Sequence, residues 1–347
     1  MSRPVKPDAS YSKRLKIGEV EIANRVVLAP MSGVTDAPFR RLTAELGAGL
    51  VVSEMTASDD LVNGRAMSVL RCEATGIGPH VVQLAGCEAH WMAEGARIAE
   101  GGGADVIDIN MGCPARHVTG GQSGSALMRD LDHALKLIAA TISAVKVPVT
   151  LKMRLGWDDR SMNAPELARR AEEAGVQLIT VHGRTRCQFY KGDANWDAVR
   201  PVKDAVSVPV VVNGDITSYD KAVCALEASG ADAVMVGRGA YGQPWLPGQI
   251  GRQLQTGVAE TAPTLQQQLG YICALYDHIC RHYGLRIGLR HARKHLGWAL
   301  DAAAATSGAS VEKLKLWRRA ILTSEDPIGV QRALNEAFDD FAWSAAA

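Results

Sequence analysis

Residues 100–110 read EGGGADVIDIN and contain the repeating unit from which the fold is predicted. An Ala/Glu-rich helix ends at glycines, which tolerate the backbone of a helix C-cap, and an apolar strand follows at once. The junction recurs as EAGVQL at 173–178 and as ASGADAV at 228–234. Strands that alternate with helices in this way predict βα units and a parallel sheet.

Eight such strands are predicted between residue 26 and the region of residue 240. Each is apolar nearly throughout, as expected for parallel strands buried on both faces. A doubly wound sheet commonly has five or six strands and a switch point. Eight evenly spaced units over roughly 215 residues favour instead an α/β fold of the (β/α)8 TIM-barrel type. The strands begin near Val26, Gly49, Pro79, Asp105, Val147, Gln177, Val208 and Asp232.

The last third of the chain has a different pattern, with helical periodicity only. Turn signals at Gly284, 306–310 and 323–327 predict three to five helices there. The sequence therefore predicts a TIM-barrel domain over residues 1–246 and a small all-helical C-terminal domain over residues 247–347.

The composition is that of a globular protein with a sizeable core, since 47% of the 347 residues are hydrophobic and 22% are charged. This mix excludes disordered, collagen-like and coiled-coil chains. The start of the chain lacks the apolar stretch of a secretory signal, and no apolar run reaches the ~18–20 residues that cross a bilayer. The seven cysteines are scattered without a CxxC pair, which predicts a reduced, cytoplasmic setting and no metal site. The net charge of +1 restricts any nucleic-acid contact to a local patch.

Polar residues follow nearly every predicted strand at its carboxyl end, where the working residues of such barrels lie. Loop starts are often polar without any function, but the same positions also contain glycines that permit close backbone approach. The positions are Pro30-Met31-Ser32, Glu54, Gln83, Asn110-Met111-Gly112-Cys113, Lys152-Met153-Arg154, His182-Gly183-Arg184, Asn213-Gly214-Asp215 and Gly237-Arg238.

The loops after the seventh and eighth strands predict a phosphate site. Asn213, Gly214 and Asp215 stand in the first loop, and Gly237 and Arg238 stand in the second. Glycine exposes backbone N–H groups to a phosphate, and Arg238 adds a positive charge. Ordinary strand-to-helix turns contain the same residue types, so the position of the loops is what favours a phosphorylated ligand.

Three further strand ends present Gln83, Lys152 and His182 to the barrel mouth. Flavin mononucleotide (FMN) suits them, because Gln83 can pair with the N3/O4 edge of the ring and Lys152 can stabilise negative charge at N1/O2. A lysine inside a barrel mouth is costly unless it meets an anion or an acceptor. His182 has a second interpretation, as a histidine that only anchors a loop.

Cys113 lies in the turn NMGCP, at the end of the fourth strand. A cysteine there can be a thiolate nucleophile or a protonated thiol that acts as a general acid. No base pairs with it in the sequence, so the proton-donating role is preferred. The other six cysteines are interpreted as small buried hydrophobic residues.

A basic stretch, RHYGLRIGLRHARKH, occupies residues 281–295 of the helical domain. Arg286, Arg290, Arg293 and Lys294 are spaced so that they form one stripe of a helix. Such a stripe can bind the phosphates of a folded RNA, and a solvated basic face has the same pattern.

Eight motifs in order along the barrel resemble those of the tRNA-dihydrouridine synthases, most closely the bacterial B-type branch. DINMGCPA together with HGRTR is highly specific, and ARKHLGW at 292–298 extends the resemblance into the helical domain. The motifs are LAPMSGVTDAPFRRL (28–42), VVQLAG (81–86), DINMGCPA (108–115), GSALM (124–128), KMRLGW (152–157), HGRTRCQFYKGDANW (182–196), NGDI (213–216) and GRGAYGQPW (237–245).

The resemblance implies an FMN-dependent reduction of the 5,6 double bond of specific uridines in tRNA, with NADPH as reductant. In that family the motif cysteine protonates the base, and it corresponds to Cys113. The family's FMN contacts correspond to Pro30, Met31, Ser32, Gln83, Lys152, His182, Asn213, Gly214, Asp215, Gly237 and Arg238.

The expected mechanism passes hydride from FMN N5 to C6 of uracil and a proton from Cys113 to C5, from the opposite face. The target base must be extruded from the tRNA to reach the barrel mouth. Asn110 and Arg184 are candidates for holding its edge, and the stripe of the helical domain is the candidate tRNA contact. The loop at 117–126 has more glycines and fewer basic residues than the family pattern, which leaves its tRNA contacts open.

Two alternatives belong to other classes. An FMN barrel of the dihydroorotate dehydrogenase type would act on a free pyrimidine, but a free base needs no basic helical platform. A non-catalytic RNA-binding regulator with a vestigial barrel would carry no flavin. The sequence shows no obligate protein partner and no membrane segment, and the expectation is a cytoplasmic monomer.

Overall fold

The computed structural model describes residues 14–346, which fall into two compact units. The first comprises the described residues up to Gly239 together with Pro247–Val258, and the second comprises Ala240–Leu246 and the described residues from Ala259 onward. This division differs from the boundary expected at residues 246 and 247. Pro247–Val258 belongs with the barrel, where Arg252 and Gln255 donate hydrogen bonds to the backbone carbonyls of Leu46 and Ala23.

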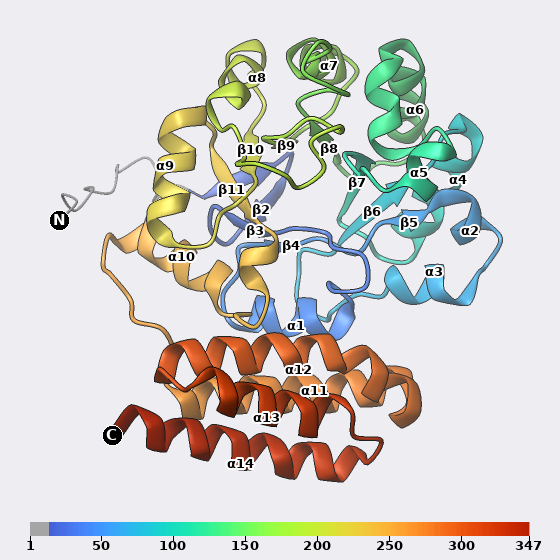
Figure 1. Cartoon of the computed structure of the whole chain (residues 1–347). Coiled ribbons are helices and arrows are strands. Elements are labelled where there is room, and N and C mark those ends of the chain that lie inside the picture. Colours follow the sequence, from blue (N-terminus) through green and yellow to red (C-terminus); the bar gives the residue numbers. More distant parts are fainter. Residues whose placement is uncertain (1–13, 347) are drawn as a thin grey trace. The chain divides into compact units, whose positions relative to one another are not determined.

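The first unit is a (β/α)8 barrel (Figure 1). All eight predicted strands are confirmed, and the second of them is split into β4 and β5. The parallel order β4-β3-β11-β10-β9-β8-β7-β6-β5 closes on itself through a parallel bridge between Val52 and Val81. The strands are β3 (Val26–Leu28), β4 (Leu50–Val51), β5 (Thr56–Ala57), β6 (Val81–Ala85), β7 (Val106–Met111), β8 (Val149–Arg154), β9 (Ile179–His182), β10 (Val210–Asn213) and β11 (Ala233–Val236).

Helices follow the strands in sequence and surround the sheet (Figure 1). The predicted C-cap role of glycine is confirmed at Gly230, which ends α9 with a left-handed φ of 66°. The helices are α1 (Ala37–Glu45), α2 (Ser58–Val62), α3 (Ala66–Arg71), α4 (Ala89–Gly101), α5 (Arg116–Gly120), α6 (Leu131–Ala144), α7 (Ala164–Glu173), α8 (Arg200–Ala205), α9 (Tyr219–Ser229) and α10 (Leu246–Thr256).

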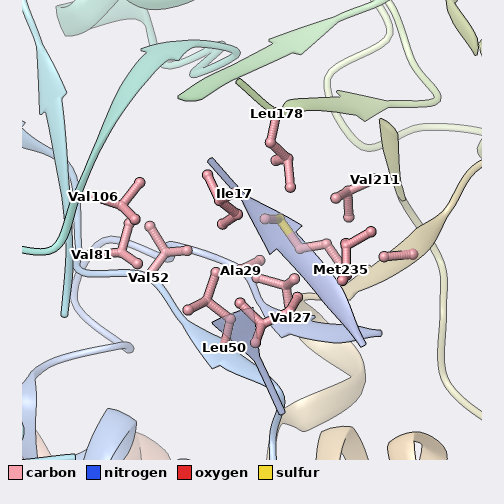
Figure 2. Packing of buried hydrophobic residues seen from close by; sticks show 13 residues of the cluster. Ile17, Val27, Ala29, Leu50, Val52, Val81, Val106, Leu178, Val211 and Met235 are labelled. Atoms are coloured by element: carbon pink, nitrogen blue, oxygen red, sulfur yellow. The ribbon is translucent and has the colours of Figure 1, made fainter. Parts of the chain in front are cut away.

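An antiparallel hairpin that the sequence pattern did not predict precedes the barrel. It consists of β1 (Leu15–Ile17) and β2 (Val20–Ile22), with Ile17 opposite Val20. Ile17 belongs to a buried cluster inside the barrel that includes Val81 and Val106, the first residues of β6 and β7 (Figure 2). The hairpin therefore fills the amino-terminal end of the barrel and leaves the carboxyl-terminal end for the site. The cluster contains Leu15, Ile17 and Ile22 with Val27, Ala29, Leu50, Val52, Val81, Val106, Leu178, Val211, Ala233 and Met235.

Replacing Ile17 with alanine is expected to lower the free energy of unfolding by about 2–5 kcal/mol, because it leaves a cavity where a buried side chain packs. Chemical denaturation followed by circular dichroism measures this loss. Lys16→Ala is the matched control, since Lys16 lies on the same strand with its side chain exposed and only an exposed ion pair to Glu21. Equal effects of the two variants would contradict the role given to the hairpin.

The second unit contains four helices, within the predicted range. They are α11 (Leu265–Tyr283), α12 (Leu285–Ser307), α13 (Val311–Leu322) and α14 (Pro327–Ala346). Helices α11 and α12 end at Gly284 and Gly308, which lie at two of the predicted turns and both have a positive φ. No helix among the described residues is long and apolar enough to cross a membrane.

Candidate functional site

The carboxyl-terminal half of the barrel interior contains a row of polar side chains from neighbouring strands. Gln83 on β6 lies opposite Asp108 on β7, and Asp108 lies opposite Thr150 on β8. Two residues further along, Asn110 lies opposite Lys152. Since residues in register on parallel strands point to the same face, these five side chains share the inside of the barrel.

Lys152 is a buried ammonium group with few protein partners that could compensate for the loss of hydration. Its Nζ donates to Asn213 Oδ1 at 3.3 Å, the one acceptor it reaches among residues 14–346. Burial and, next, the positive charge of Arg154 lower the pKa of Lys152 to about 8. Asn213 is itself held by donating to the carbonyl of Met235 at 2.8 Å. A bound acceptor or anion at Nζ would supply the missing partner.

Cys113 is half-buried in a loop that is fixed from both sides. Its backbone N–H donates to Asn110 Oδ1 at 2.9 Å, and its carbonyl accepts from the Ser125 hydroxyl at 2.8 Å. Burial raises the pKa of the Cys113 thiol, against weaker opposing effects that include the charges of Arg154 and Lys152. The raised pKa favours the protonated thiol at neutral pH.

Gly124 lets the loop return onto Cys113. Its φ is 59°, and a Cβ atom there would lie 2.8 Å from the Cys113 carbonyl oxygen. The predicted glycine-rich stretch thus has one position at which another residue would displace the cysteine loop.

The two loops predicted to bind phosphate lie after β10 and β11. Gly214 has a φ of 125°, and a Cβ there would lie 2.6 Å from Ala194 Cβ and 3.1 Å from His182 Cδ2. The close approach requires glycine and brings the loop backbone beside the imidazole. Gly237 has open space, since a Cβ there would come no nearer than 3.8 Å to Ala29 and Met31.

The Asp215 carboxylate, predicted to lie at the phosphate site, is bound by groups of the protein itself. Arg184 and Arg238 both pair with it, and the backbone N–H of Ala194 donates to it at 2.8 Å. Burial acts to raise the pKa of Asp215, but the hydrogen bonds from Arg184 and Ala194 and the charges of Arg184 and Arg238 together lower it, so the group stays ionised. A carboxylate repels phosphate, and Arg238, whose side chain is 49% exposed, is the group of this pair that a phosphate can reach.

Arg184, expected to hold the substrate, is engaged by groups of the protein itself. The side chain is buried, and it donates to Asp215 Oδ2, to Gly192 O at 2.6 Å and to Lys191 O at 3.3 Å. It also approaches His182 Nε2 at 3.3 Å. With these donors engaged, Arg184 holds the loop after β9 in place.

His182 is a buried, neutral imidazole. Burial and the charges of Arg154, Lys152 and other arginines place its pKa well below the ordinary value. Because Arg184 has only donors, His182 Nε2 accepts the hydrogen bond and the proton resides on Nδ1. His182 therefore has one N–H left to donate to a ligand.

The segment after β3 lies at the rim of the same end. Pro30 and Met31 are half-buried and Ser32 is exposed. The turn is held by the backbone N–H of Met31, which donates to the Thr35 hydroxyl at 2.8 Å, and by Glu54, which accepts from the N–H of Gly33. All predicted cofactor contacts thus follow strands at one end of the barrel.

Two buried residues of the site, Asp108 and Arg154, were given no role in the sequence analysis. Asp108 accepts hydrogen bonds from Gln83 and Thr150, and burial raises its pKa against them. Arg154 donates to the carbonyls of Gly112, Thr185 and Phe189 and so ties the cysteine loop to the loop after β9. The signal in the sequence was a charged residue inside an otherwise apolar strand.

The basic stripe lies on α12 in the second unit. Arg286 and Arg290 are exposed and Lys294 is half-buried. Arg293 is engaged by an ion pair with Glu325 at 2.7 Å and a hydrogen bond to Ser324 O. The stripe is therefore narrower than predicted, because one of its charges is neutralised.

Known proteins resemble this chain over nearly its whole length. A probable tRNA-dihydrouridine synthase of Rhizobium leguminosarum bv. phaseoli is 55% identical over 320 residues, covering 92% of this chain and 97% of that protein. The tRNA-dihydrouridine synthase B of Pseudomonas putida is 46% identical over 291 residues, covering 82% and 85%.

Solved structures share the fold at low identity. A 2-naphthoyl-CoA reductase has a TM-score of 0.59 at 13% identity and covers 96% of this chain and 69% of its own. An old yellow enzyme homologue from Zymomonas mobilis has a TM-score of 0.50 at 15% identity, covering 74% and 96%. The sequence profile described as "Dihydrouridine synthase (Dus)" matches residues 27–342. The chain therefore belongs to the dihydrouridine synthase family of oxidoreductases.

Proposed function

We propose that this protein reduces the C5–C6 double bond of specific uridines in tRNA, with FMN as bound cofactor and NADPH as reductant. The observation that carries the proposal is a protonated Cys113 thiol on the loop after β7. The neighbouring strand β8 contains the buried cation Lys152. An acid and a cation at one strand end suit the delivery of a proton and the stabilisation of negative charge. The names of the sequence relatives support tRNA as the substrate.

The residues at the barrel mouth fit FMN. Lys152 Nζ lacks a second acceptor, and there is open space beside Gly237, where a Cβ would come no nearer than 3.8 Å to another side chain. Gln83 would meet the N3/O4 edge of the ring and Lys152 the N1/O2 edge. The phosphate would lie against the loops of Asn213–Asp215 and Gly237–Arg238, and Pro30, Met31, Ser32 and His182 complete the predicted contacts.

FMN held by these residues would supply the hydride that C6 of uracil accepts. Cys113 donates its proton to C5 from the opposite side of the base, and its raised pKa keeps that proton in place until the base accepts it. Asn110 holds the backbone of Cys113 and remains the candidate for contact with the base. Arg184 remains the second candidate, with several of its donors already engaged within the protein.

Exposed Arg286 and Arg290 on α12, with Lys294, are proposed to meet tRNA phosphates. In this assignment the barrel is the FMN-binding catalytic part and the helical unit is the tRNA-binding part. The substrate places the reaction in the cytoplasm, and the expectation of a monomer is retained.

The test is an assay of purified protein, loaded with FMN, on unmodified tRNA and on free uracil and orotate. We expect a flavin spectrum, NADPH oxidation that depends on tRNA, and dihydrouridine in the recovered tRNA. Turnover of a free pyrimidine alone would favour a dehydrogenase of the dihydroorotate type. Binding of tRNA by a protein that takes up no flavin would favour a non-catalytic RNA-binding role.

A further inference from the structure

Asp108 is a buried carboxylate inside the barrel for which the proposed reaction has no direct use. Its Oδ2 accepts from Gln83 Nε2 at 2.6 Å, and its Oδ1 accepts from Thr150 Oγ1 at 2.6 Å. The three residues lie in register on β6, β7 and β8. A buried charge is unfavourable unless it is hydrogen-bonded or balanced, so its place in an apolar strand needs an explanation.

A chain of hydrogen bonds leads from Asp108 to the backbone of Cys113. Gln83 Oε1 accepts from Asn110 Nδ2 at 2.8 Å, and Asn110 Oδ1 accepts from the N–H groups of Gly112 at 3.2 Å and of Cys113 at 2.9 Å. Both carboxylate oxygens of Asp108 accept in this arrangement, and a backbone N–H only donates. Both side-chain amides between these two ends are therefore restricted to one orientation.

We propose that Asp108 is a positioning residue, which orients the Gln83 amide toward the FMN ring edge and, through Asn110, fixes the position of Cys113. In the imposed orientation Gln83 keeps one N–H on Nε2 and one lone pair on Oε1. These are the donor and the acceptor that the O4 and N3–H groups of the ring require. The inference rests on the proposed function, because it gives Asp108 a part in that reaction.

Asp108 also acts on the charge of Lys152. The ionisable groups that influence this ammonium are Arg154 on its own strand, which lowers its pKa, and Asp108 and Cys113, which raise it. His182 on β9 is neutral and leaves that balance unchanged. Removing the Asp108 charge would therefore lower the pKa of Lys152 further.

Asp108→Asn tests the proposal with little change in volume. An asparagine can accept from Gln83 and donate to Thr150, so packing is retained while the charge and the fixed polarity of the chain are lost. We expect the single-turnover rate of uridine reduction at saturating FMN to fall about 10–100-fold, the effect of a small misplacement of reacting groups. We also expect the FMN affinity of the apoprotein to begin its alkaline decline at a lower pH than in the wild type.

A matched pair of threonine variants separates positioning from stability. Thr150→Val removes one hydrogen bond to Asp108, whereas Thr141→Val removes an equally buried bond to Leu137 O in α6, away from the site. The uridine-reduction rate of Thr150→Val is expected to fall about 2–10-fold, the worth of one hydrogen bond. The Thr141→Val rate should equal the wild-type rate, although both variants should unfold at lower temperature.

Equal uridine-reduction rates for the two threonine variants, together with a pH dependence of FMN binding that is the same in both of them as in the wild type, would overturn the proposal. This result would decide even if Asp108→Asn did not fold. Wild-type protein that bound no FMN or formed no dihydrouridine would refute the proposed function instead. Failure of the inference about Asp108 would therefore appear in the threonine variants, and failure of the proposed function would appear in the wild-type protein.

Discussion

Replacing Cys113 with alanine is expected to lower the single-turnover rate of dihydrouridine formation about 10²–10⁴-fold, the usual contribution of a positioned general acid. The thiol is the group that the structure keeps protonated beside the buried cations Lys152 and Arg154, and alanine has no proton to give. Rapid mixing of reduced, FMN-loaded protein with unmodified tRNA measures the rate. Reduction of the flavin by NADPH should be unchanged, because that step does not use the thiol.

Cys224→Ala provides the control, since Cys224 is an exposed cysteine on α9 and not a buried one as expected from the sequence. Its rate of uridine reduction should match the wild type. A Cys113→Ala protein that formed dihydrouridine at the full rate would remove Cys113 as proton donor, whereas slowed flavin reduction would point to a disturbed cofactor site.

Much of the barrel was predictable because its signal is local and repeated. Each strand is a short, mostly apolar run, and three of the junctions have a glycine just before the strand, as at Gly103, Gly175 and Gly230. The hairpin β1–β2 escaped prediction because its two strands have three residues each, too few for an alternating pattern to stand out. Pro247–Val258 was assigned to the helical domain because a helical pattern does not reveal which unit the helix packs against.

The position of the site was predictable from the sequence, but the roles of some of its residues were not. Parallel strands bring their carboxyl ends together, so Gln83, Lys152 and His182 could be grouped from the sequence. The sequence could not tell that Arg184 is turned inward to Asp215, because an arginine in a loop looks the same whether its partner is internal or a ligand. Asp108 was missed for a related reason, since its partners come from two other strands.

Replacing Lys152 with methionine is expected to lower the rate of flavin reduction by NADPH about 10²–10³-fold, the usual loss when one preorganised electrostatic contact is removed. Methionine has a similar length and is readily buried, so the charge is the main change. Lys203→Met is the control, because Lys203 pairs with Asp232 at the amino-terminal end of the barrel. Its rate should equal that of the wild type, and a similar loss in both variants would indicate an effect of stability alone.

The pH dependence of FMN binding distinguishes the charge of Lys152 from its shape. The pKa of Lys152 in the free protein is about 8. An acceptor bound at Nζ favours the cationic form and raises this pKa, so binding takes up a proton above pH 8 and the affinity falls by up to about tenfold per pH unit. Titration of apoprotein with FMN between pH 6.5 and pH 9.5, a range chosen to span about 1.5 units on either side of that pKa, should show this decline in the wild type and in Lys203→Met. In Lys152→Met the affinity should be lower at neutral pH and should lack the decline, and a decline that persisted would assign it to another group.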